Sequence, residues 1–259
     1  MDVFQAAVLG LVQGITEWLP VSSKAMVTLS GKFLFGMPYQ EALATAIFLH
    51  IGTLIAATIY LRKDLIQIFR SVLEKKMDRS MLKFLVAATL MTGVIAIPLL
   101  FFALNNELPE YLFTIIIGGF LLVTAFLQRS RKDSKAETVL NTRKGIITGF
   151  FQGFAGIPGM SRSGTTITAL IYQKLSIKDA MRVSFLMSIP AVLGAELMLP
   201  FLKGGFVPGI SEMVGAAVAG IVGFLTIGAL LKLAAGTNFW KVCAFLGVIA
   251  IVLGLLTLL

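Results

Sequence analysis

A polar stretch at residues 13–26, QGITEWLPVSSKAM, interrupts an apolar run that has only just begun. Gln13 and Glu17 are spaced i, i+4, so a helix would present both side chains on one face. Ser22 and Ser23 follow a proline and offer hydroxyls together with backbone amides. A carboxylate, an amide and two hydroxyls at this spacing indicate a polar site rather than a segment that crosses hydrocarbon.

A second polar stretch at residues 158–166, PGMSRSGTT, has the composition of an anion site. The guanidinium of Arg162 can hold a phosphate with two parallel N–H donors. Gly164 lets the backbone approach closely, and the first amides of a helix beginning here would favour an anion. A carboxylate facing such a site, here Glu17, is best explained by a divalent cation, Mg²⁺ or Ca²⁺, held between it and the phosphate oxygens. The remaining hydroxyls of the stretch would add hydrogen bonds: Ser161, Ser163, Thr165 and Thr166.

The composition predicts an all-α polytopic membrane protein. The 259 residues are 57% apolar and 14% charged, and the mean hydropathy is +0.92, which excludes an ordinary soluble domain. The N-terminus lacks the pattern of a cleavable signal, so we expect it to belong to the mature protein. The single cysteine, Cys243, lies in an apolar run and is expected to serve packing. We expect one membrane domain over 1–259 with six transmembrane helices, near 41–61, 82–104, 111–128, 182–202, 211–233 and 239–259.

The formal net charge of +9 is explained by where the basic residues lie. Lysine and arginine gather after the first and third expected spans, at 62–83 and 129–144, whereas the connection 104–111 has none. This asymmetry predicts that both basic loops are cytoplasmic and that both termini lie outside the plasma membrane. It also favours contact with anionic membrane lipids over a nucleic-acid surface.

The two halves of the chain resemble each other. The stretch 10–23 matches 149–163 with Ser22 against Ser161, an offset of 139, and the following spans match at 138, which places His50 against Ser188. Each half, about 1–130 and 140–259, then holds one interrupted segment and three spans. Because three is odd, the second half would be inverted, and paired interrupted segments mark a binding site between such repeats.

We therefore expect two re-entrant hairpins whose breaks meet inside the membrane. The first would enter over 3–12, break near Pro20 and return over 27–35, and the second would cover 146–172 from the opposite side. Their polar residues should surround one cavity: Gln13, Glu17, Ser22, Ser23, Ser161, Arg162, Ser163 and Thr166.

These motifs resemble those of the undecaprenyl pyrophosphate phosphatases, the bacitracin-resistance type of integral-membrane lipid phosphatase. The family's first motif, Glu or Gln, three residues, then Glu, fits QGITE, and LPVSS continues the match. PGMSRSGTT at 158–166 fits the second motif closely, and the order of segments agrees over nearly the whole chain. The resemblance implies hydrolysis of a polyprenyl pyrophosphate to the monophosphate lipid carrier, with a divalent cation and a site open to the outer face.

The resemblance and the residue chemistry together give each candidate a role. Catalysis is expected from Glu17, which would also hold the metal, and from Arg162, with Ser22, Ser23 or an activated water as the nucleophile. The resemblance slightly favours Ser23. A homodimer is left open. Substrate binding is expected from Gln13, Lys24, Ser161, Ser163, Gly164, Thr165 and Thr166.

One residue departs from the family pattern. The family has a histidine three residues after its second serine, and here Met26 takes that position. The only histidine, His50, lies in the first span, where a helix–helix contact is the simpler interpretation. Arg182 and Glu196, in the fourth span, either face the interior or form a structural pair. The absent motif histidine keeps a second function open, a transporter that moves a polyprenyl phosphate without hydrolysing it.

Overall fold

The structure is a computed structural model that describes the chain except residues 75–77, 107, 130–138, 204–206, 237 and 258–259. The described residues form helices and connections, with no strand among them. The helices in chain order are α1 (Val3–Thr16), α2 (Ser23–Phe35), α3 (Tyr39–Tyr60), α4 (Arg62–Leu73), α5 (Ser80–Asn105), α6 (Glu110–Arg129), α7 (Thr142–Gly153), the 3₁₀ turn η1 (Phe154–Gly156), α8 (Arg162–Tyr172), α9 (Ile177–Leu202), α10 (Ile210–Gly236) and α11 (Phe239–Leu256).

Six long apolar helices confirm the expected polytopic membrane fold. Within the described residues, α3, α5, α6, α9, α10 and α11 are long and apolar enough to cross a bilayer. Their bounds follow the expected spans closely, although α9 begins at Ile177, earlier than the expected 182. The reason is a cap: the side chain of Ser176 accepts a hydrogen bond from the amide of Asp179 at 3.1 Å and starts the helix there.

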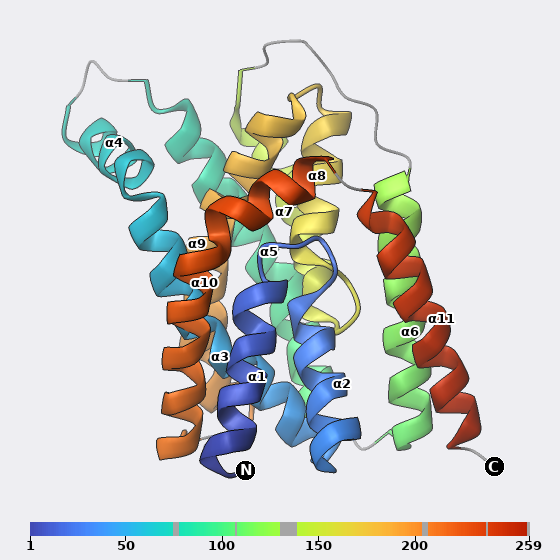
Figure 1. The fold of residues 1–259 in the computed structure, drawn as a ribbon. Coiled ribbons are helices and arrows are strands. Elements are labelled where there is room, and N and C mark those ends of the chain that lie inside the picture. The colour runs from blue at the N-terminus through green and yellow to red at the C-terminus, as the bar shows by residue number, and fades with distance from the viewer. Residues whose placement is uncertain (75–77, 107, 130–138, 204–206, 237, 258–259) are drawn as a thin grey trace.

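Two helical hairpins fill opposite halves of the bundle. Helices α1 and α2 lie in the half that contains the N-terminus, α7 and α8 lie in the other half, and the two breaks face each other at mid-height (Figure 1). Helix α1 has 14 residues, a rise of ~21 Å against a hydrocarbon core of ~30 Å. The re-entrant placement in a bilayer and the repeats 1–130 and 140–259 stay predictions.

The first hairpin returns earlier than its sequence suggests. Helix α2 begins at Ser23 instead of near residue 27, because Ser22 adopts a left-handed conformation with φ 64° and turns the chain within one residue. A residue with a Cβ pays for this conformation with about 1 kcal/mol or more, and such strain tends to gather at functional sites.

The basic stretch after the first span is also more ordered than expected. Instead of a loop, residues 62–73 form α4, at the end of the molecule opposite both termini (Figure 1). Basic residues and exposed apolar side chains share this helix, as in helices that lie along a membrane surface. The basic residues are Arg62, Lys63 and Arg70, and the exposed apolar residues include Ile66, Phe69 and Leu73.

Glycines let the helices approach closely. A Cβ built on Gly52 of α3 would lie 1.9 Å from the carbonyl oxygen of Ala216 on α10, and one on Gly10 of α1 would lie 2.3 Å from that of Gly215. Helices in membranes associate by packing closely at small residues, because burial of apolar surface contributes little free energy to association within lipid. Helix α10 thus fixes both α1, which carries Glu17 at its end, and α3.

Replacing Gly52 by alanine is expected to lower the stability of the protein in detergent, because the added methyl group meets backbone atoms that cannot rotate away. We expect the free energy of unfolding to fall by about 1–3 kcal/mol, which would be measured as a lower thermal unfolding temperature. Gly119 of α6 is the matched control, since a Cβ there meets nothing within 4 Å. Gly119→Ala should leave stability unchanged or raise it slightly, and equal effects of the two substitutions would contradict this view of the α3–α10 contact.

Candidate active site

The end of α1 places Glu17 in the interior. Glu17 is the residue after the last helical turn and is only 6% exposed. As the i, i+4 spacing predicts, Gln13 lies on the same face, and its Nε2 donates to Glu17 Oε2 at 3.0 Å. Ser23, the first residue of α2, donates from Oγ to the same oxygen at 2.6 Å. The break between α1 and α2 therefore folds the second serine back onto the carboxylate.

Helix α6 supports both breaks through two buried side chains. Gln128 donates from Nε2 to the carbonyl oxygen of Pro20 at 2.5 Å. One turn earlier, Thr124 accepts from the amide of Ser161 at 3.1 Å and donates to the carbonyl oxygen of Gly159 at 3.2 Å. Cys243, expected to serve packing, also donates to Pro20 at 3.1 Å. The carbonyl and amide groups of the two breaks, which have no partner within a helix, thus form hydrogen bonds with side chains, as buried backbone groups require.

The second break ends where the sequence predicts, at the start of α8. Ser161 is its N-cap, and its hydroxyl accepts from the amide of Gly164 at 3.1 Å. Arg162 and Ser163 are the first residues of α8, where amides have no acceptor within their own helix and can bind an anion. Gly164 itself is closely packed, since a Cβ there would lie 3.0 Å from Cβ of Ser161.

Glu17 and Arg162 join the two breaks across 145 residues of sequence. Arg162 Nη2 donates to Glu17 Oε1 at 2.5 Å, and both side chains are largely buried. The guanidinium is further fixed by the carbonyl oxygen of Ser184, 3.3 Å from Nη1, and by the ring of Phe185, whose centroid is 5.4 Å away. Lys24 bridges the same two segments, because its Nζ donates to the carbonyl oxygens of Ala155 at 2.8 Å and Gly156 at 3.2 Å.

A cavity of about 100 Å³ lies where these segments meet. Seven of the residues expected at the site line it: Glu17, Ser22, Ser23, Lys24, Ser161, Arg162 and Ser163.

Four expected residues lie behind the cavity instead of lining it. Gln13 supports Glu17, and the hydroxyl of Thr166 contacts that of Ser184 at 2.6 Å. Thr165 bonds to the carbonyl oxygens of Ser161 and Arg162 within α8, and Gly164 carries the cap described above. These residues hold the charged groups in place.

Ser22 is distinctive among the lining residues. It is 5% exposed, and its Oγ has no hydrogen-bond partner within the described part of the chain. A buried hydroxyl without a partner costs about 1–3 kcal/mol. Together with the left-handed backbone, this indicates a group kept ready for a ligand.

The cavity also contains groups that sequence reasoning did not assign to it. His50 lines it from α3, and its Nε2 lies 3.5 Å from Ser23 Oγ and 3.3 Å from Glu17 Oε2. The pairing of His50 with Ser188 in the repeat comparison was the one signal that pointed there. Glu196 lines the cavity from α9, and its Oε1 is buried without a partner among the described residues.

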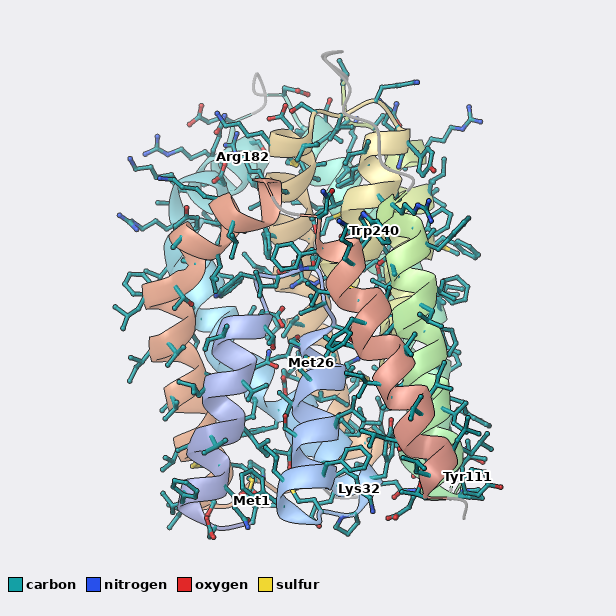
Figure 2. The ribbon with its side chains drawn as sticks, turned by 45° about the vertical axis from the view of Figure 1, so that its right-hand side comes forward. Met1, Met26, Lys32, Tyr111, Arg182 and Trp240 are labelled. Carbon is teal, nitrogen blue, oxygen red and sulfur yellow. The ribbon has the colours of Figure 1, made fainter. Side chains whose placement is uncertain are left out.

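Of the two alternatives for Arg182 and Glu196, the structural pair is wrong, and only Glu196 faces the interior. Arg182 forms an ion pair with Asp64 of α4 at one end of the molecule, where Figure 2 labels it. Glu196 is therefore free of Arg182 and belongs to the cavity. Met26, which the motif resemblance places at the position of a histidine, does not line the cavity. Met26 lies at mid-height (Figure 2) and packs against the apolar residues beside α6 and α11.

The residues that line the cavity can be compared with those that a divalent cation would need for binding. Its lining has two basic residues, Lys24 and Arg162, and two acidic ones, Glu17 and Glu196, so their formal charges cancel. No three His, Cys, Asp or Glu side chains cluster as a ready metal cage in the described part of the chain. Glu17 nevertheless fits a cation that takes its other ligands from phosphate and water, which is how Mg²⁺ is commonly held.

The fold and this cavity define an integral membrane protein in which two interrupted helical segments meet in a buried, charged site. The chain belongs to the bacitracin resistance protein BacA family, whose model matches residues 6–255. It is 39% identical to an undecaprenyl-diphosphatase of Methanococcoides burtonii over 97% of this chain and 98% of that protein. Undecaprenyl-diphosphatases of Haloarcula marismortui and Sulfurisphaera tokodaii are 36% and 34% identical, covering 98% and 100% of both chains respectively.

Proposed function

We propose that this protein is a membrane-bound phosphatase that hydrolyses a polyprenyl diphosphate of the undecaprenyl type to the polyprenyl monophosphate and inorganic phosphate. The observation that carries the proposal is the contact of Glu17 with Arg162 beside Ser23, which unites both sequence motifs in one buried cavity. The names of the relatives support the same reaction. A buried site of this kind suits a reaction in which charge on phosphate must be stabilised away from bulk water.

The second break would hold the diphosphate. The guanidinium of Arg162 offers planar paired donors, and the first amides of α8 add a positive helix end. Ser161 and Ser163 lie beside this position, with their hydroxyls 3.3 Å apart. Lys24 contributes positive charge from the facing segment, although its three donors are partly used by backbone carbonyl oxygens. The residues behind the cavity keep Arg162 and Glu17 oriented.

The nucleophile would come from the first break. Three candidates remain, Ser22, Ser23 and a bound water, and the contacts favour Ser23. Its hydroxyl touches a carboxylate and lies near an imidazole, whereas the hydroxyl of Ser22 has no acceptor among the residues that the structure describes. An activated serine needs such a proton acceptor within reach. Ser22 is better suited to donate a hydrogen bond to the incoming phosphate.

A divalent cation, Mg²⁺ or Ca²⁺, would enter with the diphosphate. A diphosphate adds negative charge to a cavity whose formal charges already cancel, so additional positive charge is needed. The cation would be held by Glu17 and phosphate oxygens and would supply charge neutralisation at the phosphate.

Removal of divalent cations with EDTA is expected to lower phosphate release at least about tenfold while leaving the thermal unfolding temperature of the ligand-free protein unchanged. The second half of this prediction follows because the described residues form no metal cage that folding would need. Added Mg²⁺ or Ca²⁺ should restore the rate. Full activity in EDTA would reject the cation, and a lowered unfolding temperature would reveal a resident structural metal.

The protein would act in the plasma membrane with both termini outside and the basic segments in the cytoplasm. The distribution of lysine and arginine supports this orientation, as does the location of α4 at the end opposite the termini (Figure 1). Membrane lipids would cover the exposed apolar faces of the spanning helices, and anionic headgroups would meet α4. A homodimer is compatible with this arrangement and is not required by the cavity, which one chain completes.

The test of the proposed function is release of inorganic phosphate from a long-chain polyprenyl diphosphate by the purified protein, with Mg²⁺, with Ca²⁺ and with neither. Hydrolysis predicts phosphate and polyprenyl monophosphate in equal amounts. A transporter would bind the lipid and release no phosphate. In that case, movement of polyprenyl phosphate across reconstituted vesicles would replace hydrolysis as the function.

A further inference from the structure

His50 is the only histidine of the chain and lies in the middle of α3, a helix that beyond its first turn otherwise carries apolar and small residues through the bundle. The ring is held by its own helix, because Nδ1 lies 2.6 Å from the carbonyl oxygen of Ala46. A carbonyl oxygen only accepts hydrogen bonds, so Nδ1 must carry a proton. In the neutral ring this leaves the lone pair on Nε2, the nitrogen that faces the cavity.

Two groups of the first break lie in front of Nε2. Ser23 Oγ is 3.5 Å away, and Glu17 Oε2 is 3.3 Å away. Ser23 thus has two acceptors within reach, a carboxylate and an imidazole. The carboxylate is already engaged, by Arg162 on one oxygen and by Gln13 on the other. The imidazole has no other partner for Nε2 in the described part of the chain.

On the basis of the proposed hydrolysis, we infer that His50 is the catalytic base that takes the proton of the nucleophile. In the first step, Ser23 Oγ bonds to the terminal phosphorus, and the bond from this phosphorus to the bridging oxygen breaks. The polyprenyl monophosphate leaves as an anion, and the hydroxyl proton of Ser23 moves to Nε2 of His50. A water then attacks the phosphorus of the phosphoserine, and the bond from phosphorus to Ser23 Oγ breaks. One proton of the water goes to Ser23 Oγ, its hydroxyl stays on the released phosphate, and His50 gives its proton to solvent.

In this mechanism, the contact between His50 and Glu17 stabilises the protonated ring. Once Nε2 has taken the proton, the ring is an imidazolium whose new N–H faces the carboxylate. A carboxylate in this position stabilises the charge that forms on the ring, as in triads of a nucleophile, a base and an acid. In this chain the ring comes from α3, while position 26 of α2 carries a methionine that packs against apolar residues outside the cavity. The imidazole is supplied from a different helix.

The test compares phosphate release by wild type, His50→Gln, His50→Ala and the control Thr58→Val. Thr58 lies two turns further along α3, is exposed, and bonds only within the helix. Glutamine keeps a polar group that can form hydrogen bonds but cannot accept the proton. We expect His50→Gln to lose of order 10²-fold or more in kcat with a nearly unchanged KM, and Thr58→Val to retain the wild-type rate.

Added imidazole is expected to accelerate His50→Ala and to leave wild type and Thr58→Val unaffected, a response that a merely structural histidine would not give. A His50→Gln enzyme within about threefold of wild type overturns the inference, and so does a His50→Ala enzyme that imidazole fails to accelerate. These outcomes are distinct from failure of the proposed function itself, in which wild type would release no phosphate under any condition.

Discussion

Replacing Glu17 by glutamine is expected to reduce phosphate release by at least about 10²-fold, equivalent to about 2.7 kcal/mol of transition-state stabilisation. Three side chains donate hydrogen bonds to this carboxylate: Arg162 to Oε1, and Gln13 and Ser23 to Oε2. An amide in either orientation turns an NH₂ group towards one of these donors. It also removes the charge that balances Arg162 and that would hold the cation.

Glu110→Gln is the matched control for this experiment. Glu110 also pairs with a basic residue, Lys32, which Figure 2 shows at the same end of the molecule as Met1, and neither residue lines the cavity. An exposed pair of this kind contributes at most about 1 kcal/mol to stability, so the control should retain its rate. Because loss of a buried partner can also destabilise the fold, thermal unfolding of both variants should be recorded. A folded Glu17→Gln enzyme with full activity would remove Glu17 from the catalytic assignment.

Arg162→Lys is expected to cause a second loss of at least about 10²-fold, although the substitution keeps the charge. Arg162 serves three partners at once: one nitrogen reaches Glu17, another reaches the carbonyl oxygen of Ser184, and the plane of the group lies over Phe185. An ammonium cannot match this planar geometry or bind phosphate through two parallel donors.

Arg182→Lys provides the comparison for Arg162→Lys. Arg182 also pairs with a carboxylate, that of Asp64, but at the surface end of the molecule. We expect a wild-type rate for this variant, measured by the same phosphate assay. Similar losses in the two variants would indicate that arginine matters for the fold in general, and an unimpaired Arg162→Lys would show that a point charge suffices at the site.

The transmembrane helices could be predicted because the bilayer imposes a minimum length on them. Six apolar runs of about 20 residues admit few alternatives, and the structure has six helices of that kind in its described part. The contact between the two motifs was also foreseeable. Repeated Gln-Gly and serine positions at a nearly constant offset indicated that the two breaks correspond, and Glu17 does reach Arg162.

Other features could not be read from local patterns. The early start of α2 depends on one left-handed residue, Ser22, which no periodicity reveals. Helix α4 forms where charge counting indicated only a basic connection. His50 and Glu196 reach the cavity because of how α3 and α9 pack and rotate, and helices that are apolar on every side give no signal for rotation. Long-range packing, not spacing along the chain, decides these contacts.

The most direct test of the two-segment site is an experimental structure of the protein with Ca²⁺ and a non-hydrolysable methylenediphosphonate analogue of a polyprenyl diphosphate. We predict phosphonate oxygens within about 3 Å of the guanidinium of Arg162 and of the first amides of α8, with the terminal phosphorus facing Ser23. A diphosphonate bound outside the cavity, or one that leaves Arg162 without contact, would contradict the account.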